Sequence, residues 1–144
     1  MSNKIDLEQC QKKGFVKNSE KAKGWVKKEL DVAQRFLEST KFVFKSQQYE
    51  STVIMGYLVL FHLNRALVYN KGKIVKTHIC VVFAVKELYS NNKDILEMVT
   101  GAENALISRN QIQYDGYNAN KEMAEFILSL AEDYFGVVKK LLNF

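Results

Sequence analysis

The side chains best suited to chemistry in this 144-residue chain are two histidines, His62 and His78, and one arginine, Arg109. The two histidines lack the paired spacing of a zinc site, and the sequence contains no CxxC pattern. It also has no glycine-rich phosphate-binding loop, and no spacing supports a Ser/His/acid triad. The sequence therefore predicts a site that works without a metal ion or a cofactor.

Arg109 stands out because it continues the apolar face of a predicted helix over residues 93–113. That face carries apolar residues at helical spacing, namely Ile95, Met98, Ala102, Ala105 and Leu106. An arginine keeps its charge, so on such a face it must pair with a carboxylate or open to a cleft. Glu97 and Glu103 lie on other faces of the same helix. We therefore expect Arg109, with Asn110 beside it, to face a cleft that is formed with its symmetry mate and is open to an anion; an internal ion pair is the alternative.

Two other groups of polar residues are candidates for binding an anion. His62 and Arg65 interrupt a strongly apolar helix, where a buried polar group without a partner costs about 1–3 kcal/mol. Four further residues gather around a predicted turn and the start of the next helix: Lys71, Lys73, Lys76 and His78. Free backbone N–H groups at a helix N-terminus add to the lysine charge there, which makes this turn a candidate anion site. The simpler interpretation is a solvated loop.

The positive charge of the chain is concentrated in its first 28 residues. The whole chain has a net charge of +5. Residues 1–28 contain eight lysines against Asp6, Glu8 and Glu20, which gives +5, so the remaining residues sum to zero. We expect residues 1–18 to be a loosely organised basic segment, either a solvated terminus or an arm that attracts an acidic partner.

The rest of the chain, residues 19–144, has the pattern of a helical bundle. It has no proline, which favours long helices joined by short turns. The central helix is predicted over residues 49–70, because Val53–Phe61 has no charged residue and such a segment must be buried on all sides. Amphipathic patterns predict further helices over residues 19–46, 78–90, 93–113 and 119–143. The predicted fold is all-α, an up-and-down bundle of four long helices and one short helix.

The two cysteines and the N-terminus bear on where the protein resides. Cys10 and Cys80 lie in unlike surroundings without a pairing pattern, so we expect free thiols in a reducing cytoplasm. The N-terminus lacks the apolar core of a signal peptide. The apolar run of the central helix is shorter than the ~20 residues of a membrane span. The sequence therefore predicts a cytoplasmic protein that does not associate with a membrane.

Several short motifs, taken together, resemble the HEPN domain family. They follow one another in the family's order over about residues 22–142: Tyr49-Glu50, Val53 and Gly56-Tyr57; Phe61-His62 and Arg65-Ala66-Leu67; Thr77-His78; and Arg109 followed by Tyr114-Asp115. The chain is thus similar to small stand-alone HEPN-domain proteins of archaea or bacteria. The resemblance implies an all-α bundle that often forms a homodimer.

The resemblance also implies a range of functions. Many HEPN proteins are metal-independent ribonucleases, others work with a nucleotidyltransferase as toxin and antitoxin, and others bind RNA or nucleotides without catalysis. The ribonuclease motif is an arginine, a polar residue, a few more residues and then a histidine. Arg109 and Asn110 match its start, but Tyr114 stands in place of the histidine. A tyrosine, with a pKa of about 10, is a poor general base near pH 7. We therefore expect a protein that binds RNA or a nucleotide and has a degenerate catalytic motif.

Two alternatives to this function remain open in the sequence. One is an active ribonuclease that uses Arg109 with Tyr114 or His62 as the proton carrier, and the other is a structural or protein-interaction bundle. Five residues on a helix turn by about 140°, so we expect Arg109 and Tyr114 to share a site only if the helix ends before Tyr114 or the site forms across a dimer axis.

Tyrosines near the motif are candidates for modification. In some HEPN toxins the partner nucleotidyltransferase attaches AMP to a tyrosine near the motif. Tyr114 and Tyr117 flank the turn formed by Asp115 and Gly116. We therefore expect Tyr114 or Tyr117 to be solvent-accessible and open to this modification.

Overall fold

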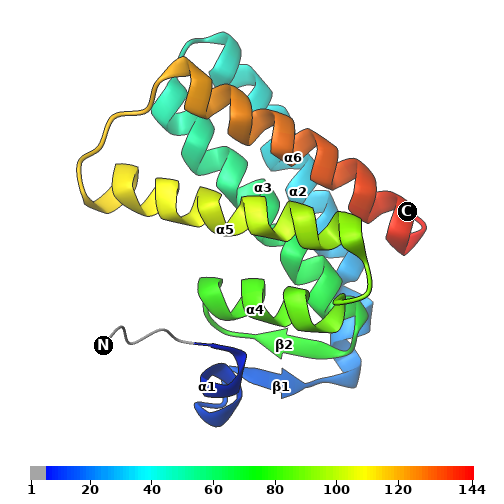
Figure 1. The fold of residues 1–144 in the computed structure, drawn as a ribbon. Helices are drawn as coiled ribbons and strands as arrows, with labels where there is room; N and C mark the ends of the chain where they lie inside the picture. Colours follow the sequence, from blue (N-terminus) through cyan, green and yellow to red (C-terminus); the bar gives the residue numbers. More distant parts are fainter. Residues whose placement is uncertain (1–5) are drawn as a thin grey trace.

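The computed structural model describes residues 6–144, which form a helical bundle with a small sheet at one end (Figure 1). The elements follow in the order α1 (Leu7–Lys12), β1 (Val16–Asn18), the 3-10 helix η1 (Glu20–Trp25), α2 (Val26–Lys45), α3 (Tyr49–Asn70), β2 (Lys73–Val75), α4 (His78–Leu88), α5 (Lys93–Tyr114) and α6 (Lys121–Leu142). The predicted all-α fold is confirmed, since the described residues contain six α-helices and only one two-stranded sheet.

The helix α3 lies at the centre of the bundle, as predicted, and α2, α4, α5 and α6 all contact it (Figure 1). Its bounds match the predicted 49–70, because Gly72 adopts the left-handed conformation (φ +72°) that favours a helix end. At Gly56 a Cβ atom would lie 2.4 Å from Ile127 Cγ2, so a glycine is needed for α6 to pack this closely. The fully buried Tyr134 of α6 donates its hydroxyl to Asn64 Oδ1 at 2.5 Å, which pairs the polar Asn64 inside the core.

The expectation that Val53–Phe61 is almost entirely buried is only partly right. Val53, Tyr57, Val59 and Leu60 are buried, but four other side chains are half-buried, namely Ile54, Met55, Leu58 and Phe61. Ile54, Leu58 and Phe61 follow one side of α3. That side is incompletely covered because α5 crosses α3 obliquely and does not run along it (Figure 1).

Residues 6–18 are folded onto the bundle, which corrects the expectation of a loosely organised segment. They form α1 and β1, and β1 pairs antiparallel with β2 so that Lys17 lies opposite Ile74. Backbone hydrogen bonds from Ser19 to Gly72 and from Lys76 to Phe15 extend this pairing. A three-residue strand is too short to leave a recognisable alternation in the sequence. Residues 1–5 lie outside the described residues, and a domain boundary after residue 18 stays a prediction.

Other element boundaries differ slightly from the predicted ones. The predicted helix over residues 19–46 is divided, because residues 20–25 form η1 before α2 begins at Val26. Ser19 precedes η1 and makes no side-chain capping bond. The helices α4 and α5 are capped by Thr77 and Asn92, which accept hydrogen bonds from backbone N–H groups three residues later.

The expectation that Cys10 and Cys80 are free thiols is wrong. They form a disulfide that joins α1 to the first turn of α4, with Cα atoms 5.9 Å apart, and both side chains are fully buried. The two cysteines are 70 residues apart in the sequence, so their partnership depends on the folded chain and leaves no local spacing pattern.

Among the described residues, α3 is the one helix long and apolar enough to cross a membrane. Most of the apolar stretch of α3 is buried inside the bundle. This burial is consistent with the core helix of a soluble protein.

Candidate functional site

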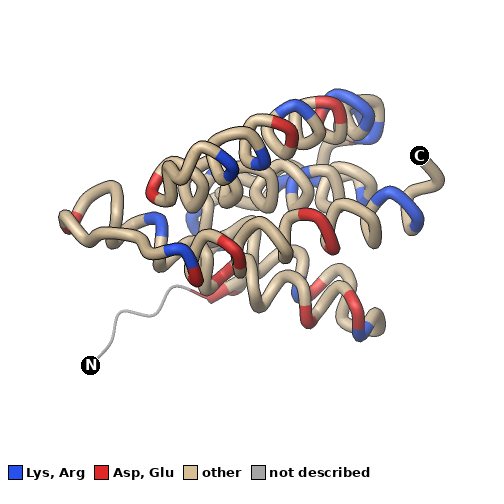
Figure 2. Tube along the Cα trace, turned by 90° about the horizontal axis from the view of Figure 1, so that it is seen from above, with Lys and Arg blue, Asp and Glu red and all other residues tan. Residues whose placement is uncertain are grey.

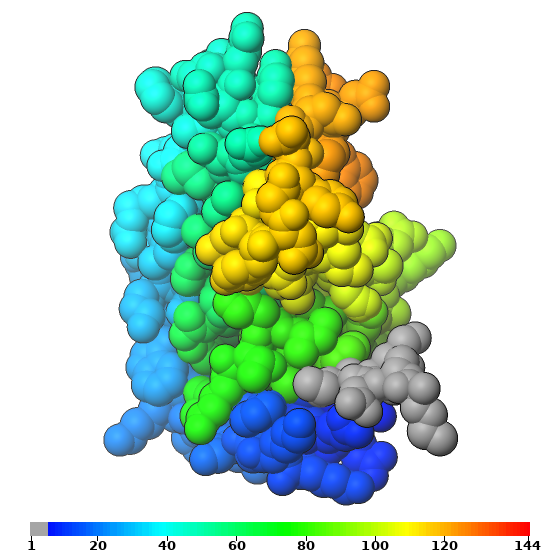
Figure 3. Space-filling view, turned by 90° about the vertical axis from the view of Figure 1, so that its left-hand side faces the viewer, coloured from blue at the N-terminus to red at the C-terminus, as the bar shows by residue number. Residues whose placement is uncertain are grey.

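Arg109 lies near the end of α5, where this helix faces the middle of α3 and the start of α4. It borders two adjoining hollows, of about 200 and 360 Å³, which share Arg109 and His78. Their other lining residues are Ile54, Tyr57, Leu58 and Gln113 in the first, and Thr77, Ile79, Leu106, Asn110 and Tyr114 in the second. Figure 3 faces the side of the molecule on which α5 ends and α4 begins. The two hollows together are called the Arg109 pocket below.

The guanidinium of Arg109 has no carboxylate within ion-pair distance among the described residues. The residue is only 9% exposed. Its Nη1 donates to Gln113 Oε1 at 3.2 Å and to Tyr114 Oη at 3.4 Å, and its Nε is buried without a hydrogen-bond partner. The guanidinium carbon lies 4.8 Å from the centre of the Tyr57 ring. Arg109 therefore opens to a hollow within one chain and makes no internal ion pair with the described residues. The contribution of a symmetry mate to this cleft stays a prediction.

Arg109 and Tyr114 come together within one chain, which corrects the argument from helical rotation. The helix α5 includes Tyr114, yet the Tyr114 hydroxyl reaches Arg109 Nη1. Both side chains are long, so their ends meet although they leave the helix in different directions. Neither an early helix end nor a dimer axis is required for this contact.

His78 is positioned by the first turn of α4. Thr77 Oγ1 caps this helix by accepting a hydrogen bond from the Cys80 N–H at 3.1 Å, so His78 is the first helical residue and projects towards α3. Its ring stacks on Phe61 with 4.2 Å between centroids, and its Nδ1 lies 2.5 Å from the Tyr57 hydroxyl. Tyr57 thus contacts both residues: its hydroxyl lies against His78, and its ring lies under the guanidinium of Arg109.

Two pKa shifts define the protonation of this pair. Burial raises the pKa of Tyr57 to about 12, although the neighbouring Arg109 opposes the shift. Burial, followed by the positive charges of Arg109 and Arg65, lowers the pKa of His78. Tyr57 therefore keeps its proton near neutral pH. It donates to His78 Nδ1 when the neutral imidazole is the Nε2–H tautomer. A neutral His78 then carries its own proton on Nε2.

His62 and Arg65 form a separate cluster around a buried carboxylate. His62 Nδ1 lies 2.6 Å from Glu29 Oε2, and Arg65 Nη2 lies 3.4 Å from Glu29 Oε1. Glu29 is only 2% exposed, and Arg65 also donates to the Tyr69 hydroxyl. His62 and Arg65 therefore have an internal counter-charge, and neither lines the Arg109 pocket.

The predicted cluster of turn residues is divided by the fold. His78 lines the Arg109 pocket, whereas Lys71 lies over the Tyr89 ring and Lys73 donates to Asn18 Oδ1 at 2.6 Å. Lys76 is exposed directly before the cap of α4. The turn does not gather these side chains around one anion, because Lys71 and Lys73 have different partners and Lys76 does not line the Arg109 pocket.

The tyrosines proposed for modification are accessible. Tyr114 is 68% exposed and Tyr117 is 58% exposed, which confirms the expected accessibility. Modification of either residue stays a prediction.

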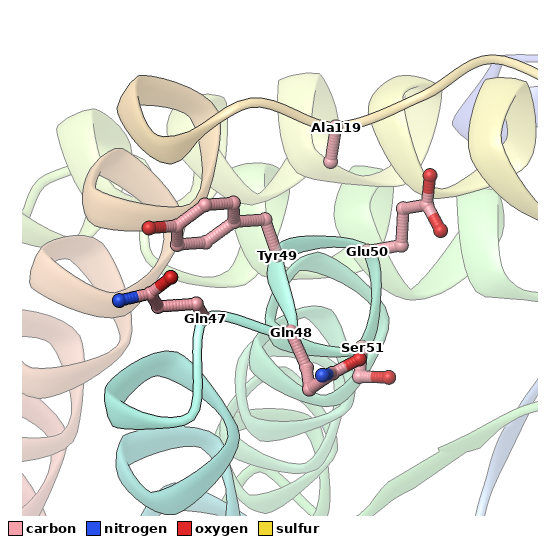
Figure 4. Close-up of a pocket in the computed structure, with 6 residues that line it drawn as sticks. All are labelled: Gln47, Gln48, Tyr49, Glu50, Ser51 and Ala119. Carbon is pink, nitrogen blue, oxygen red and sulfur yellow. The ribbon is translucent and has the colours of Figure 1, made fainter.

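Another hollow, of about 220 Å³, lies between the α2–α3 turn and the segment before α6 (Figure 4). It is lined by Gln47, Gln48, Tyr49, Glu50, Ser51 and Ala119. Among the described residues no cationic side chain lines it, and Glu50 contributes a negative charge. The Arg109 pocket is therefore the better site for an anion.

Three residues of these clusters escaped sequence reasoning. Tyr57 resembles a core residue of α3, Gln113 follows the last apolar residues of α5, and Glu29 resembles one of many charged residues on an amphipathic helix. Only the Gly56-Tyr57 motif gave a signal, because it contributed to the family resemblance. The partnerships of Glu29 and Gln113 depend on which side chains the fold brings close to them.

Comparison with known proteins agrees with the motifs. The family model of the HEPN domain matches residues 26–141, which is most of the chain and runs from the start of α2 to the last turn of α6. No curated protein matches the chain. The matched region contains the whole Arg109 pocket, whereas α1 and β1 precede it. Because the match covers the bundle from α2 almost to the end of α6, the chain belongs to the HEPN domain family.

Proposed function

We propose that this protein binds a phosphate group of RNA or of a nucleotide in the Arg109 pocket. Membership of the HEPN family supports an RNA- or nucleotide-related role in general. The observation that carries the proposal is the buried guanidinium of Arg109, which has no carboxylate partner among the described residues and has an unpaired Nε. A buried charge without a counter-charge is costly, and a bound anion would offset that cost.

The chemistry of the pocket suits a phosphate. An arginine presents planar N–H donors that match the oxygens of a phosphate, and Nε–H is one of the donors used in such a contact. His78, in its neutral form, adds an Nε2–H donor held in place by Tyr57. The Asn110 amide, which lines the same pocket, is a further donor.

A metal-independent ribonuclease is the second candidate, and one observation favours it. His78 lies in the same pocket as Arg109 and supplies the imidazole that the motif lacks at Tyr114. A neutral imidazole near pH 7 is suited to proton transfer. If this candidate is right, RNA incubated with the protein is cleaved, and cleavage is lost in His78→Gln without loss of binding through Arg109. His62 is a weaker proton carrier for this site because it is engaged by Glu29.

Partners and location are further proposals. A toxin–antitoxin pairing with a nucleotidyltransferase that attaches AMP to Tyr114 or Tyr117 agrees with the exposure of both tyrosines. A homodimer is also proposed, on the family membership of the chain. Mass spectrometry after incubation with a cognate transferase and ATP tests the modification. A cytoplasmic location is also proposed, although the Cys10–Cys80 disulfide is unusual there outside hyperthermophiles.

The test of phosphate binding uses a fluorescently labelled uridine trinucleotide and measures its polarisation with increasing protein. Arg109→Gln should weaken binding at least about tenfold, which corresponds to about 1.4 kcal/mol. The matched control is Arg35→Gln, which removes the same charge from an exposed position on α2. Equal affinities of the wild-type protein and Arg109→Gln would contradict the proposal.

A further inference from the structure

The basic charge of the chain gathers at one end of the folded molecule. Residues 6–28 and 71–77, called the basic end, contain ten lysines and three acidic residues, a net charge of +7. Residues 29–70 and 78–144 contain ten lysines and arginines against 13 acidic residues, a net charge of −3. Viewed from the opposite end, acidic and basic positions are interspersed along the helices (Figure 2). The charge is therefore segregated by the fold.

The basic end is a fixed surface. Its two segments lie far apart in the sequence, and the β1–β2 pairing and the Cys10–Cys80 disulfide hold them together. Lys23 also packs against the turn before β2, since a Cβ atom at Gly72 would lie 3.3 Å from Lys23 Cε. A ligand that binds a surface already ordered by the fold does not have to order the backbone that carries the charges.

Much of this charge is uncompensated. Lys12 and Lys27 pair with Glu8 and Asp31. Seven other lysines are exposed and make no ion pair within the described residues, namely Lys13, Lys17, Lys21, Lys23, Lys28, Lys71 and Lys76. Such a surface attracts a polyanion and releases counterions when it binds one.

The basic end adjoins the Arg109 pocket. Lys76 directly precedes Thr77 and His78, both of which line the pocket. In Figure 3 the start of α4, in green, lies between the blue N-terminal segment and the yellow end of α5. We infer that the basic end continues the Arg109 pocket into a track for the backbone of single-stranded RNA. This inference rests on the proposed function and makes the ligand a polynucleotide, not a mononucleotide.

The surface favours RNA over an anionic membrane. A membrane-bound surface combines its lysines with several apolar side chains that insert between lipids. Among the described residues of the basic end, the one exposed large apolar side chain is Trp25, at 38%. Lys28 Nζ lies 5.9 Å from the centre of its ring. An aromatic ring flanked by a cation is the arrangement on which single-stranded bases stack.

The test measures how the affinity for RNA depends on the length of the RNA, on the salt concentration and on the lysines of the basic end. Binding of the labelled trinucleotide and of a single-stranded RNA of about 15 nucleotides, within the usual site sizes, is measured across a range of salt concentrations. The variant Lys13→Gln/Lys17→Gln/Lys21→Gln changes three exposed lysines that lie outside the Arg109 pocket. The matched control Lys41→Gln/Lys45→Gln/Lys121→Gln removes the same charge from exposed positions on α2 and α6.

The salt dependence is the slope of log affinity against log salt concentration. For the long RNA, the magnitude of this slope should be smaller by about 2 in the basic-end variant, because each phosphate contact on a single strand contributes about 0.7. The affinity of this variant for the trinucleotide should not change, and the control should keep the wild-type slope. An unchanged slope in the basic-end variant, or an equal loss in the control, overturns the track. If the basic-end variant loses binding to phosphatidylserine vesicles but binds RNA as the wild-type protein does, the RNA track is overturned and the basic end is a membrane-binding surface. Failure of the proposed function is distinguishable, because it appears as trinucleotide binding that does not depend on Arg109.

Discussion

The guanidinium of Arg109 lies over the ring of Tyr57, 4.8 Å from its centre, and no carboxylate of the described residues pairs with it. This relationship separates a binding arginine from a structural one. An arginine retained for stability would have a buried counter-charge, as Arg65 has in Glu29.

Replacing Arg109 therefore should not unfold the protein. We expect Arg109→Gln to change the free energy of unfolding by less than about 1 kcal/mol, or to increase it, because it removes an unpaired buried charge. Urea unfolding followed by circular dichroism measures the change. A loss of about 3–5 kcal/mol, the usual cost of breaking a buried ion pair, would show that Arg109 is structural.

Replacing Glu29 should have the opposite effect. Glu29 is buried and contacts both His62 and Arg65, so Glu29→Gln leaves Arg65 without its counter-charge. We expect a loss of about 3–5 kcal/mol in the free energy of unfolding. Glu38→Gln, at an exposed position on the same helix, is the control and should stay within about 0.5 kcal/mol of the wild-type protein.

The lowered pKa of His78 predicts a loss of stability in acid. Below the unfolded pKa of about 6.5, the unfolded chain binds a proton at His78 more readily than the folded chain does. The free energy of unfolding should therefore fall as the pH drops below about 6.5. The fall should be smaller in His78→Gln, measured by urea unfolding at several pH values. Identical pH dependence in both proteins would contradict the burial of a neutral His78.

The disulfide predicts a large effect of reduction. It closes a loop of about 70 residues, for which the chain-entropy model gives about 4 kcal/mol. The free energy of unfolding of Cys10→Ala/Cys80→Ala should therefore be lower by about 2–5 kcal/mol. The wild-type protein in a strong reductant provides the matched comparison. Equal stability of the oxidised protein and the double variant would show that the bridge does not constrain the fold.

Two leucines on α3 test the position of the central helix. Leu60 is fully buried, so Leu60→Ala should cost about 2–5 kcal/mol in the free energy of unfolding. Leu58 is half-buried beside the Arg109 pocket, so Leu58→Ala should cost less. Thermal or urea unfolding of both variants gives the comparison, and equal costs would contradict the open side of α3.

The sequence predicts the parts of this structure that repeat along the chain. The long apolar run of α3 and the amphipathic patterns of α5 and α6 are local, and they place these helices correctly. The same reasoning identifies Arg109, because a charge on an apolar face is visible in the pattern.

The features that the sequence did not predict depend on distant partners. The β1–β2 pairing, the Cys10–Cys80 disulfide and the Tyr57–His78 hydrogen bond join residues separated by more than 20 positions. The Arg109–Tyr114 contact was missed for another reason, because backbone rotation does not account for the reach of two long side chains.

The central claim is that Arg109 holds a phosphate, and the most direct measurement observes its Nε–H group by NMR. The chain contains three arginines, Arg35, Arg65 and Arg109, so the Nε–H resonances are few and single variants assign them. Adding uridine monophosphate should shift the Arg109 Nε–H resonance and leave the exposed Arg35 unchanged, because the buried Nε of Arg109 gains a hydrogen-bond acceptor. A titration in which the Arg109 resonance does not move at nucleotide saturation, or at millimolar nucleotide if no saturation occurs, would contradict the account.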